Sequence, residues 1–134
     1  MKTSIKSEMD RRLNAAIQEN RAGRHAEAIA LLNPLAAEYP KSAAVVGYLA
    51  GVYFGLNNYV KAEKSFRKAS RLSPKSELAS LGLFHSLWNL GRRREAFREM
   101  RRLLKVTDSE EYKMLLRDLA VAGEFEREFD AIAS

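Results

Sequence analysis

Two histidines, His25 and His85, are the side chains best suited to acid–base chemistry near neutral pH. Such chemistry needs a nucleophile or base with an orienting partner in the same site. The helical neighbours of His85 are Leu81, Trp88 and Asn89, with no Asp, Glu or Cys among them, so no catalytic triad or metal cluster assembles locally. No phosphate-binding glycine loop or dinucleotide fingerprint occurs either. The sequence therefore predicts a protein that is not an enzyme and that uses no metal or cofactor.

Length and composition indicate one domain over residues 1–134, with 46% hydrophobic and 30% charged residues. No cysteine is present, which excludes disulfides and a thiol nucleophile. No stretch approaches the roughly 18–20 apolar residues of a membrane span, and no apolar run follows the first residues as in a secretory signal. We expect a cytoplasmic protein.

The elements that position these side chains follow from an internal repeat. Three kinds of residue recur at a spacing of 34: an alanine, a residue suited to a tight turn, and a proline or aspartate near a helix end. The three sets are Ala28, Ala62 and Ala96; Gly23, Asn57 and Gly91; and Pro40, Pro74 and Asp108. Three independent sets that keep one period indicate a repeat protein.

Each period predicts two helices separated by a turn. In the middle period the first helix carries an apolar stripe from Val46 to Tyr53, and the second ends before Pro74. Pro34 falls inside the second helix of the first period and is expected to kink or shorten it. Helix starts are predicted at polar residues that can accept hydrogen bonds from the first turn, which are Ser7, Ser42, Ser76 and Thr107.

This pattern resembles the tetratricopeptide repeat (TPR) family. The resemblance implies an all-α, right-handed solenoid of antiparallel helix pairs, with three repeats and a C-terminal capping hairpin. The repeats cover about 9–42, 43–76 and 77–110, and residues 109–134 form the divergent capping hairpin. Ser80 departs from the family pattern, which has an aromatic or apolar residue there, and His25 stands where the family has an aromatic packing residue.

The resemblance also implies a concave groove that binds peptides or helices of other proteins. Its predicted lining in this chain is Leu13, Ile17, Asn20, Arg21, Gly47, Gly51, Phe54, Leu78, Leu81, His85, Trp88 and Asn89. Gly47, Gly51 and Gly55 would form a bare stripe along one helix, beside an apolar patch. We therefore predict a protein-interaction module, an adaptor or chaperone-like binder that holds an apolar peptide or amphipathic helix.

Relatives that grip the C-terminal carboxylate of chaperone tails use Lys, Arg and Asn in this groove. The corresponding positions here hold residues that cannot bind a carboxylate, which are Leu13, Ile17, Tyr48, Leu78 and Gly82.

Two other occupants of the groove remain open. The chain's own C-terminal residues, through Phe125, Phe129 and Ile132, could fold back into it. A second copy could cover it instead, which would make the protein a homo-oligomer or a self-assembling scaffold. We favour a different protein as the partner.

Positive charge concentrates on the two later second helices, in a basic stripe expected to face outward. The stripe comprises Lys61, Lys64, Lys68, Arg71, Arg94, Arg98, Arg101 and Arg102. A solvated face is the favoured interpretation, and binding of an anionic membrane surface or nucleic acid is the alternative. The stripe lacks interleaved aromatic residues for base stacking, which argues against nucleic acid. The acidic residues Glu124, Glu126, Glu128 and Asp130 could instead pair with the stripe of a neighbouring molecule.

Overall fold

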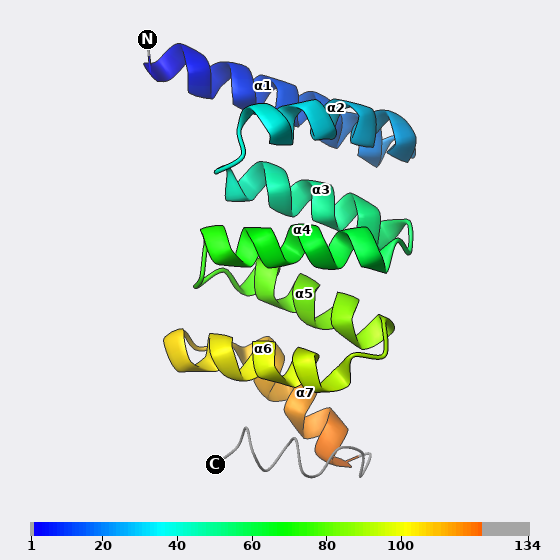
Figure 1. Ribbon diagram of the computed structural model, residues 1–134, viewed down its shortest axis with the longest axis vertical. Helices are drawn as coiled ribbons and strands as arrows, with labels where there is room; N and C mark the ends of the chain where they lie inside the picture. Colours follow the sequence, from blue (N-terminus) through cyan, green and yellow to red (C-terminus); the bar gives the residue numbers. More distant parts are fainter. Residues whose placement is uncertain (1, 122–134) are drawn as a thin grey trace.

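The computed structural model describes residues 2–121, and within that part the chain forms seven α-helices. They are α1 (Lys2–Arg21), α2 (His25–Glu38), α3 (Ala43–Gly55), α4 (Tyr59–Leu72), α5 (Glu77–Asn89), α6 (Arg93–Val106) and α7 (Glu110–Val121). Consecutive helices pack on one another from α1 to α6, and α3 also touches α5. The helices stack along the long axis of the molecule as a solenoid of helix pairs (Figure 1). The predicted all-α fold class is confirmed.

The turn inside each helix pair lies at the same repeat position. Gly23, Asn57 and Gly91 have φ values of +83°, +60° and +78°. This left-handed conformation is easily adopted by glycine and is tolerated by asparagine, so it explains why the period keeps these residue types there. The turns bring the second helix of each pair back antiparallel to the first.

The helix starts agree with the sequence at two of four positions. Ser42 Oγ accepts a hydrogen bond from Val45 N at 3.3 Å, and Ser76 Oγ accepts one from Ala79 N at 3.2 Å. The start predicted at Thr107 is wrong: Thr107 follows α6 in an extended conformation, and Ser109 Oγ accepts a bond from Tyr112 N at 3.2 Å.

The first helix is longer than predicted, because α1 begins at Lys2 rather than after Ser7. Residues 2–6 contain no proline or glycine that would stop it. Pro34 lies inside α2 without shortening it, and the helix continues to Glu38. The residue four positions earlier, Ala30, is exposed, so water can bind the carbonyl that the proline leaves without an N–H partner.

Two large apolar clusters form most of the core, and a small third cluster of Val46, Ala69 and Ala79 joins α3, α4 and α5. The first joins α1, α2, α3 and α4 through Ala16, Leu32, Leu49, Val52, Tyr53 and Ala62. The second joins α5, α6 and α7 through Leu83, Phe84, Leu87, Ala96, Phe97, Met100, Leu103, Tyr112 and Leu116. Phe66 of α4 packs against both clusters. Its ring lies so close to Gly82 of α5 that a Cβ built there would be 2.3 Å from the nearest ring atom.

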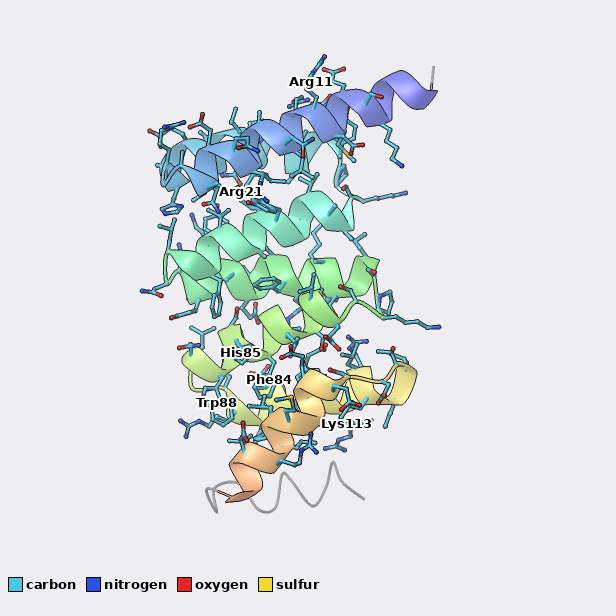
Figure 2. The ribbon with its side chains drawn as sticks, turned by 180° about the vertical axis from the view of Figure 1, so that it is seen from behind. Arg11, Arg21, Phe84, His85, Trp88 and Lys113 are labelled. Atoms are coloured by element: carbon cyan, nitrogen blue, oxygen red, sulfur yellow. The ribbon has the colours of Figure 1, made fainter. Side chains whose placement is uncertain are left out.

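The odd-numbered and even-numbered helices occupy opposite sides of the stack. In Figure 1 the even-numbered helices lie nearer the viewer and α7 passes behind α6, whereas the reverse view of Figure 2 brings α7 forward. The second helix of the predicted capping hairpin, and with it Phe125, Phe129 and Ile132, falls outside the described residues.

Candidate functional site

An uncharged cavity lies between α3, α4 and α5. Its volume is about 470 Å³. The lining consists of small, apolar or hydroxyl-bearing residues, namely Ala43, Ala44, Gly47, Tyr48, Gly51, Phe66, Ala69, Ser73, Ser76, Leu78 and Ala79. Among the described residues, no charged side chain lines the cavity, so it can accept an apolar group without leaving a buried charge unpaired.

The glycines of α3 keep this cavity open. A Cβ added at Gly51 would meet no heavy atom within 4 Å, and one added at Gly47 would lie 3.9 Å from Ala69 Cβ. A side chain at Gly51 would therefore project into free space that a ligand can occupy. At the rim, Leu78 is 82% exposed, which is unusual for a large aliphatic residue. The structure thus brings Gly47, Gly51 and Leu78 of the predicted groove around one cavity.

Three other predicted groove residues do not line this cavity, because their side chains are engaged elsewhere. Phe54 is half-buried, packs against the first cluster and meets the Tyr59 ring edge-on at 5.3 Å between centroids. Leu81 and Trp88 pack against the second cluster. The apolar patch predicted from the sequence is therefore divided between the cavity and the core.

The ring of Trp88 is held by aromatic and cationic neighbours. It stacks on Phe84 with centroids 5.7 Å apart, meets Phe97 edge-on at 5.8 Å, and lies 4.8 Å from the Arg93 guanidinium carbon. Figure 2 shows Phe84, His85 and Trp88 grouped on α5. These contacts belong to the packing between α5 and α6 and give Trp88 a structural role.

His85 is exposed on one side and lies edge-on to Phe84 on the other, with ring centroids 5.4 Å apart. Partial burial lowers the pKa of His85, and the carboxylate of Glu111 on α7 opposes that shift. The neutral ring is therefore the prevailing form at neutral pH. Asn89 donates its side-chain amide to the carbonyl of His85 at 2.7 Å, so that amide is occupied within its own helix.

The predicted groove residues of α1 also lie away from the cavity. Leu13 and Ile17 are half-buried, and Leu13 packs against the first cluster. Asn20 Oδ1 lies 2.6 Å from His25 Nδ1, so the two side chains join the end of α1 to the start of α2. His25 is exposed and does not pack as the aromatic residue that the repeat position predicts. Arg21 is exposed (Figure 2).

The basic stripe lies on α4 and α6, as the sequence places it, and most of its members are exposed. Lys61 lies 5.4 Å from the centre of the Tyr53 ring. Arg102 differs from the other members of the stripe, because its guanidinium bonds to protein groups. Its guanidinium donates to the carbonyl of Pro74 at 2.8 Å, to Ser70 Oγ at 3.0 Å and to the Glu99 carboxylate at 2.7 Å. Arg102 therefore ties α6 to α4.

A buried polar cluster was not predicted from the sequence. Ser80 is fully buried and donates to Glu99 Oε2 at 2.6 Å, so the Tyr112 hydroxyl, at 2.7 Å, donates to Ser80 Oγ. Burial raises the pKa of Tyr112 far above its ordinary value, which keeps that hydroxyl protonated. The signal in the sequence is Ser80 itself, a polar residue at a position that the repeat buries.

Metal sites and membrane-spanning helices are both missing from the described part of the chain. No group of three or more His, Asp or Glu side chains in residues 2–121 could hold a metal ion. Within the same residues, no helix is long and apolar enough to cross a membrane.

Comparison with known proteins finds a family model that matches part of the chain and solved structures that share its fold. Residues 20–67 match the family model described as tetratricopeptide repeat. Comparison with curated protein sequences finds no relative. Among solved structures, the chain is similar to the first TPR of Spaghetti (RPAP3) bound to the HSP90 peptide SRMEEVD. That match has a TM-score of 0.74 and 20% identity over 85% of this chain and 91% of the other.

A second similar structure is the Yersinia enterocolitica type III secretion chaperone SycD in complex with a peptide of the translocator YopD. Its TM-score is 0.73, with 14% identity over 95% of this chain and 93% of the other. A point mutant of MamA matches with a TM-score of 0.67 and 19% identity over 76% and 74% of the two chains. The predicted resemblance is confirmed: residues 20–67 carry the tetratricopeptide repeat match, and the chain as a whole has the fold of tetratricopeptide repeat proteins.

Proposed function

We propose that this protein is a protein-interaction module that anchors an apolar side chain of a partner polypeptide in the cavity between α3, α4 and α5. The observation that carries the proposal is the cavity itself. Its lining has no charged side chain, Gly51 leaves it open, and the exposed Leu78 lies at its rim. An interior glycine costs a helix up to about 1 kcal/mol relative to alanine. A glycine that lowers helix stability at an exposed position is consistent with a surface that binds a ligand.

Two of the similar structures hold peptides, namely the HSP90 peptide in the TPR of RPAP3 and the YopD peptide in SycD. These precedents support polypeptide as the class of ligand. Three of the last four residues of the HSP90 peptide are acidic, whereas the described lining of this cavity offers no cation to pair with them. We therefore favour a partner segment with apolar anchors, as an amphipathic helix or extended peptide presents.

Selection from a display library of random short peptides tests this proposal with a defined probe. We expect enriched peptides to carry large apolar residues and to bind Gly51→Arg at least about tenfold more weakly, a loss of about 1.4 kcal/mol. Gly55→Arg is the matched control, because Gly55 is also open and on α3 but does not line the cavity. Leu78→Glu and its control Val60→Glu form a second pair at exposed positions.

The choice of Leu78 rather than Leu81 matters because Leu81 packs against the core, and a charge there would confuse loss of binding with loss of fold. The far-ultraviolet circular dichroism of each variant verifies that the helices remain. Peptides that bind Gly51→Arg as tightly as the wild type, or an enriched set dominated by acidic C-termini, would contradict the proposal.

A further inference from the structure

A second surface, independent of the groove, runs along the even-numbered helices. We call it the basic face and define it by the exposed side chains Lys64, Lys68 and Arg71 of α4 and Arg94, Arg98, Arg101 and Lys105 of α6. On each helix these residues are separated by three or four positions, which aligns them in a single row. Like charges at this spacing repel one another, so the rows are destabilising unless an anion covers them.

The acidic residues of α4 and α6 form their ion pairs with other arginines rather than with the basic face, and Arg98 acts on Glu95 only through its charge, which helps to lower the pKa of that carboxyl. Glu63 pairs with Arg67 at 2.9 Å and with Arg92 at 3.1 Å. Glu95 pairs with Arg92. Glu99 pairs with Arg102 at 2.7 Å. Within residues 2–121, no cation of the basic face forms an ion pair.

The two rows are held at a fixed separation. Arg102 of α6 bonds to Ser70 Oγ and to the carbonyl of Pro74, and Arg92 reaches Glu63 of α4. Between the rows lie two hollows of about 380 and 270 Å³. Arg71 and Arg98 line one hollow each, and Glu99 lines both, where Arg102 pairs with its carboxylate. Glu95 lines the smaller hollow and pairs with Arg92. A preorganised trough between rows of positive charge suits an extended or helical acidic segment, because little side-chain ordering remains to be done on binding.

The chain itself contains a segment of the required charge. Residues 122–134 hold four acidic side chains and one basic side chain, Arg127, whereas residues 43–76 hold one acidic and six basic side chains. Within the acidic part, Glu124, Glu126, Glu128 and Asp130 recur at every second position. α7, which leads into this segment, packs on the side of the stack opposite the exposed face of α6 (Figures 1 and 2). The end of the described chain therefore lies behind α6, away from the chain's own basic face, which favours a second copy as the source of the acidic residues.

We propose that the basic face binds the acidic residues 122–134 of a second copy of this chain. Such a contact joins two different surfaces, so it is heterologous and adds copies head to tail until a ring closes or a chain grows. Salt screens exposed charges beyond a Debye length of about 10 Å at 0.1 M, so assembly falls as salt rises.

Reciprocal charge reversal tests the proposal on the full-length chain by sedimentation equilibrium. The face variant is Arg98→Glu/Arg101→Glu, and the tail variant is Glu124→Arg/Glu126→Arg/Glu128→Arg. We expect wild-type mass to rise with concentration at low salt, and each variant alone to associate at least about tenfold more weakly. An equimolar mixture of the two variants restores association, because the native tail of one variant meets the native face of the other and the reversed tail meets the reversed face. A chain that carries both reversals also regains assembly. The matched control is Lys6→Glu/Arg11→Glu on α1, which leaves assembly unchanged.

Three results would overturn the proposal. The first is wild-type protein that stays monomeric at every concentration in low salt. The second is assembly that the tail variant forms as well as the wild type does. The third is binding of a short RNA duplex that depends on Arg98 and Arg101 while the tail reversals have no effect, which would identify nucleic acid as the ligand. The exposed positions of the face variant keep the fold, and circular dichroism verifies this.

Discussion

Two junctions of the solenoid have the same helix-pair geometry but are filled in different ways. Where α3, α4 and α5 meet, Gly51 leaves open space and Leu78 remains exposed. Where α5, α6 and α7 meet, aromatic rings and a hydrogen-bonded cluster of Ser80, Glu99 and Tyr112 fill the interior. The first junction leaves apolar surface uncovered. In the second, as throughout the described residues, no buried polar side-chain atom lacks a hydrogen-bond partner.

The repeat sets the backbone geometry of both junctions, and the residues at single positions determine whether a junction is open or filled. The open junction is less stable but leaves surface that a ligand can reach, whereas the filled junction holds the next repeat in place. Substitutions at the filled junction should therefore change the free energy of unfolding, and those at the open one should change binding.

The largest effect is expected at the boundary between the junctions, at Gly82. Because a Cβ there would lie 2.3 Å from the Phe66 ring, Gly82→Leu forces α4 and α5 apart. We expect a loss of about 3 kcal/mol in the free energy of unfolding, measured by urea denaturation. Phe66→Ala in the same chain removes the clashing ring and should recover part of this loss. A Gly82→Leu variant as stable as the wild type would contradict the close packing.

The filled junction should respond next most strongly, through Ser80→Ala. This change removes the acceptor of the Tyr112 hydroxyl and one donor to Glu99, in a region without access to water. We expect a loss of about 2 kcal/mol, because Glu99 keeps its bonds to Arg102 while the buried Tyr112 hydroxyl loses its partner, and such a group costs about 1–3 kcal/mol. The measurement is a double-mutant cycle with Tyr112→Phe, in which the two losses should not add. Additive losses would show that Ser80 and Tyr112 act independently.

Sequence reasoning predicts the repeated architecture well because its signals are local. The left-handed turns at Gly23, Asn57 and Gly91 and the caps at Ser42 and Ser76 each depend on residues within a few positions. The 34-residue period then places Gly47 and Leu78 in neighbouring repeats, where the structure finds them around one cavity. The function of that cavity remains a proposal.

The sequence could not place Trp88 or the polar cluster, because both depend on long-range contacts. Trp88 occupies a groove position in the repeat pattern, yet Phe97 and Arg93 of the next helix hold its ring in the packed region. Ser80 finds its partners 19 and 32 residues away, at Glu99 and Tyr112. Periodicity assigns a face to each residue, but which neighbour completes a hydrogen bond follows only from the packing of three helices.

A smaller effect, of opposite sign, is expected at the open junction. Gly51→Ala adds a methyl group with no heavy atom within 4 Å, so only the conformational entropy of the helix changes. We expect the protein to gain up to about 1 kcal/mol in the free energy of unfolding while affinity for an apolar peptide falls. Urea denaturation and peptide titration on the same sample measure both quantities. A variant that loses stability would show that the space at Gly51 is not open.

The smallest effect is expected on the pKa of His85, which lies on α5 and interacts electrostatically with Glu111 of α7. Partial burial lowers the pKa of His85 below its usual value of about 6.5, so the native state binds fewer protons than the unfolded chain near that pH. The corresponding stability is complete above the unfolded pKa and declines as the pH falls toward the lower native value. Nuclear magnetic resonance titration of the ring should show His85 titrating below that ordinary value. Glu111→Gln should lower its pKa further, because the carboxylate that favours the charged ring is gone. A pKa of His85 that rises in Glu111→Gln, or stays the same, would contradict the action of the Glu111 carboxylate on the His85 ring.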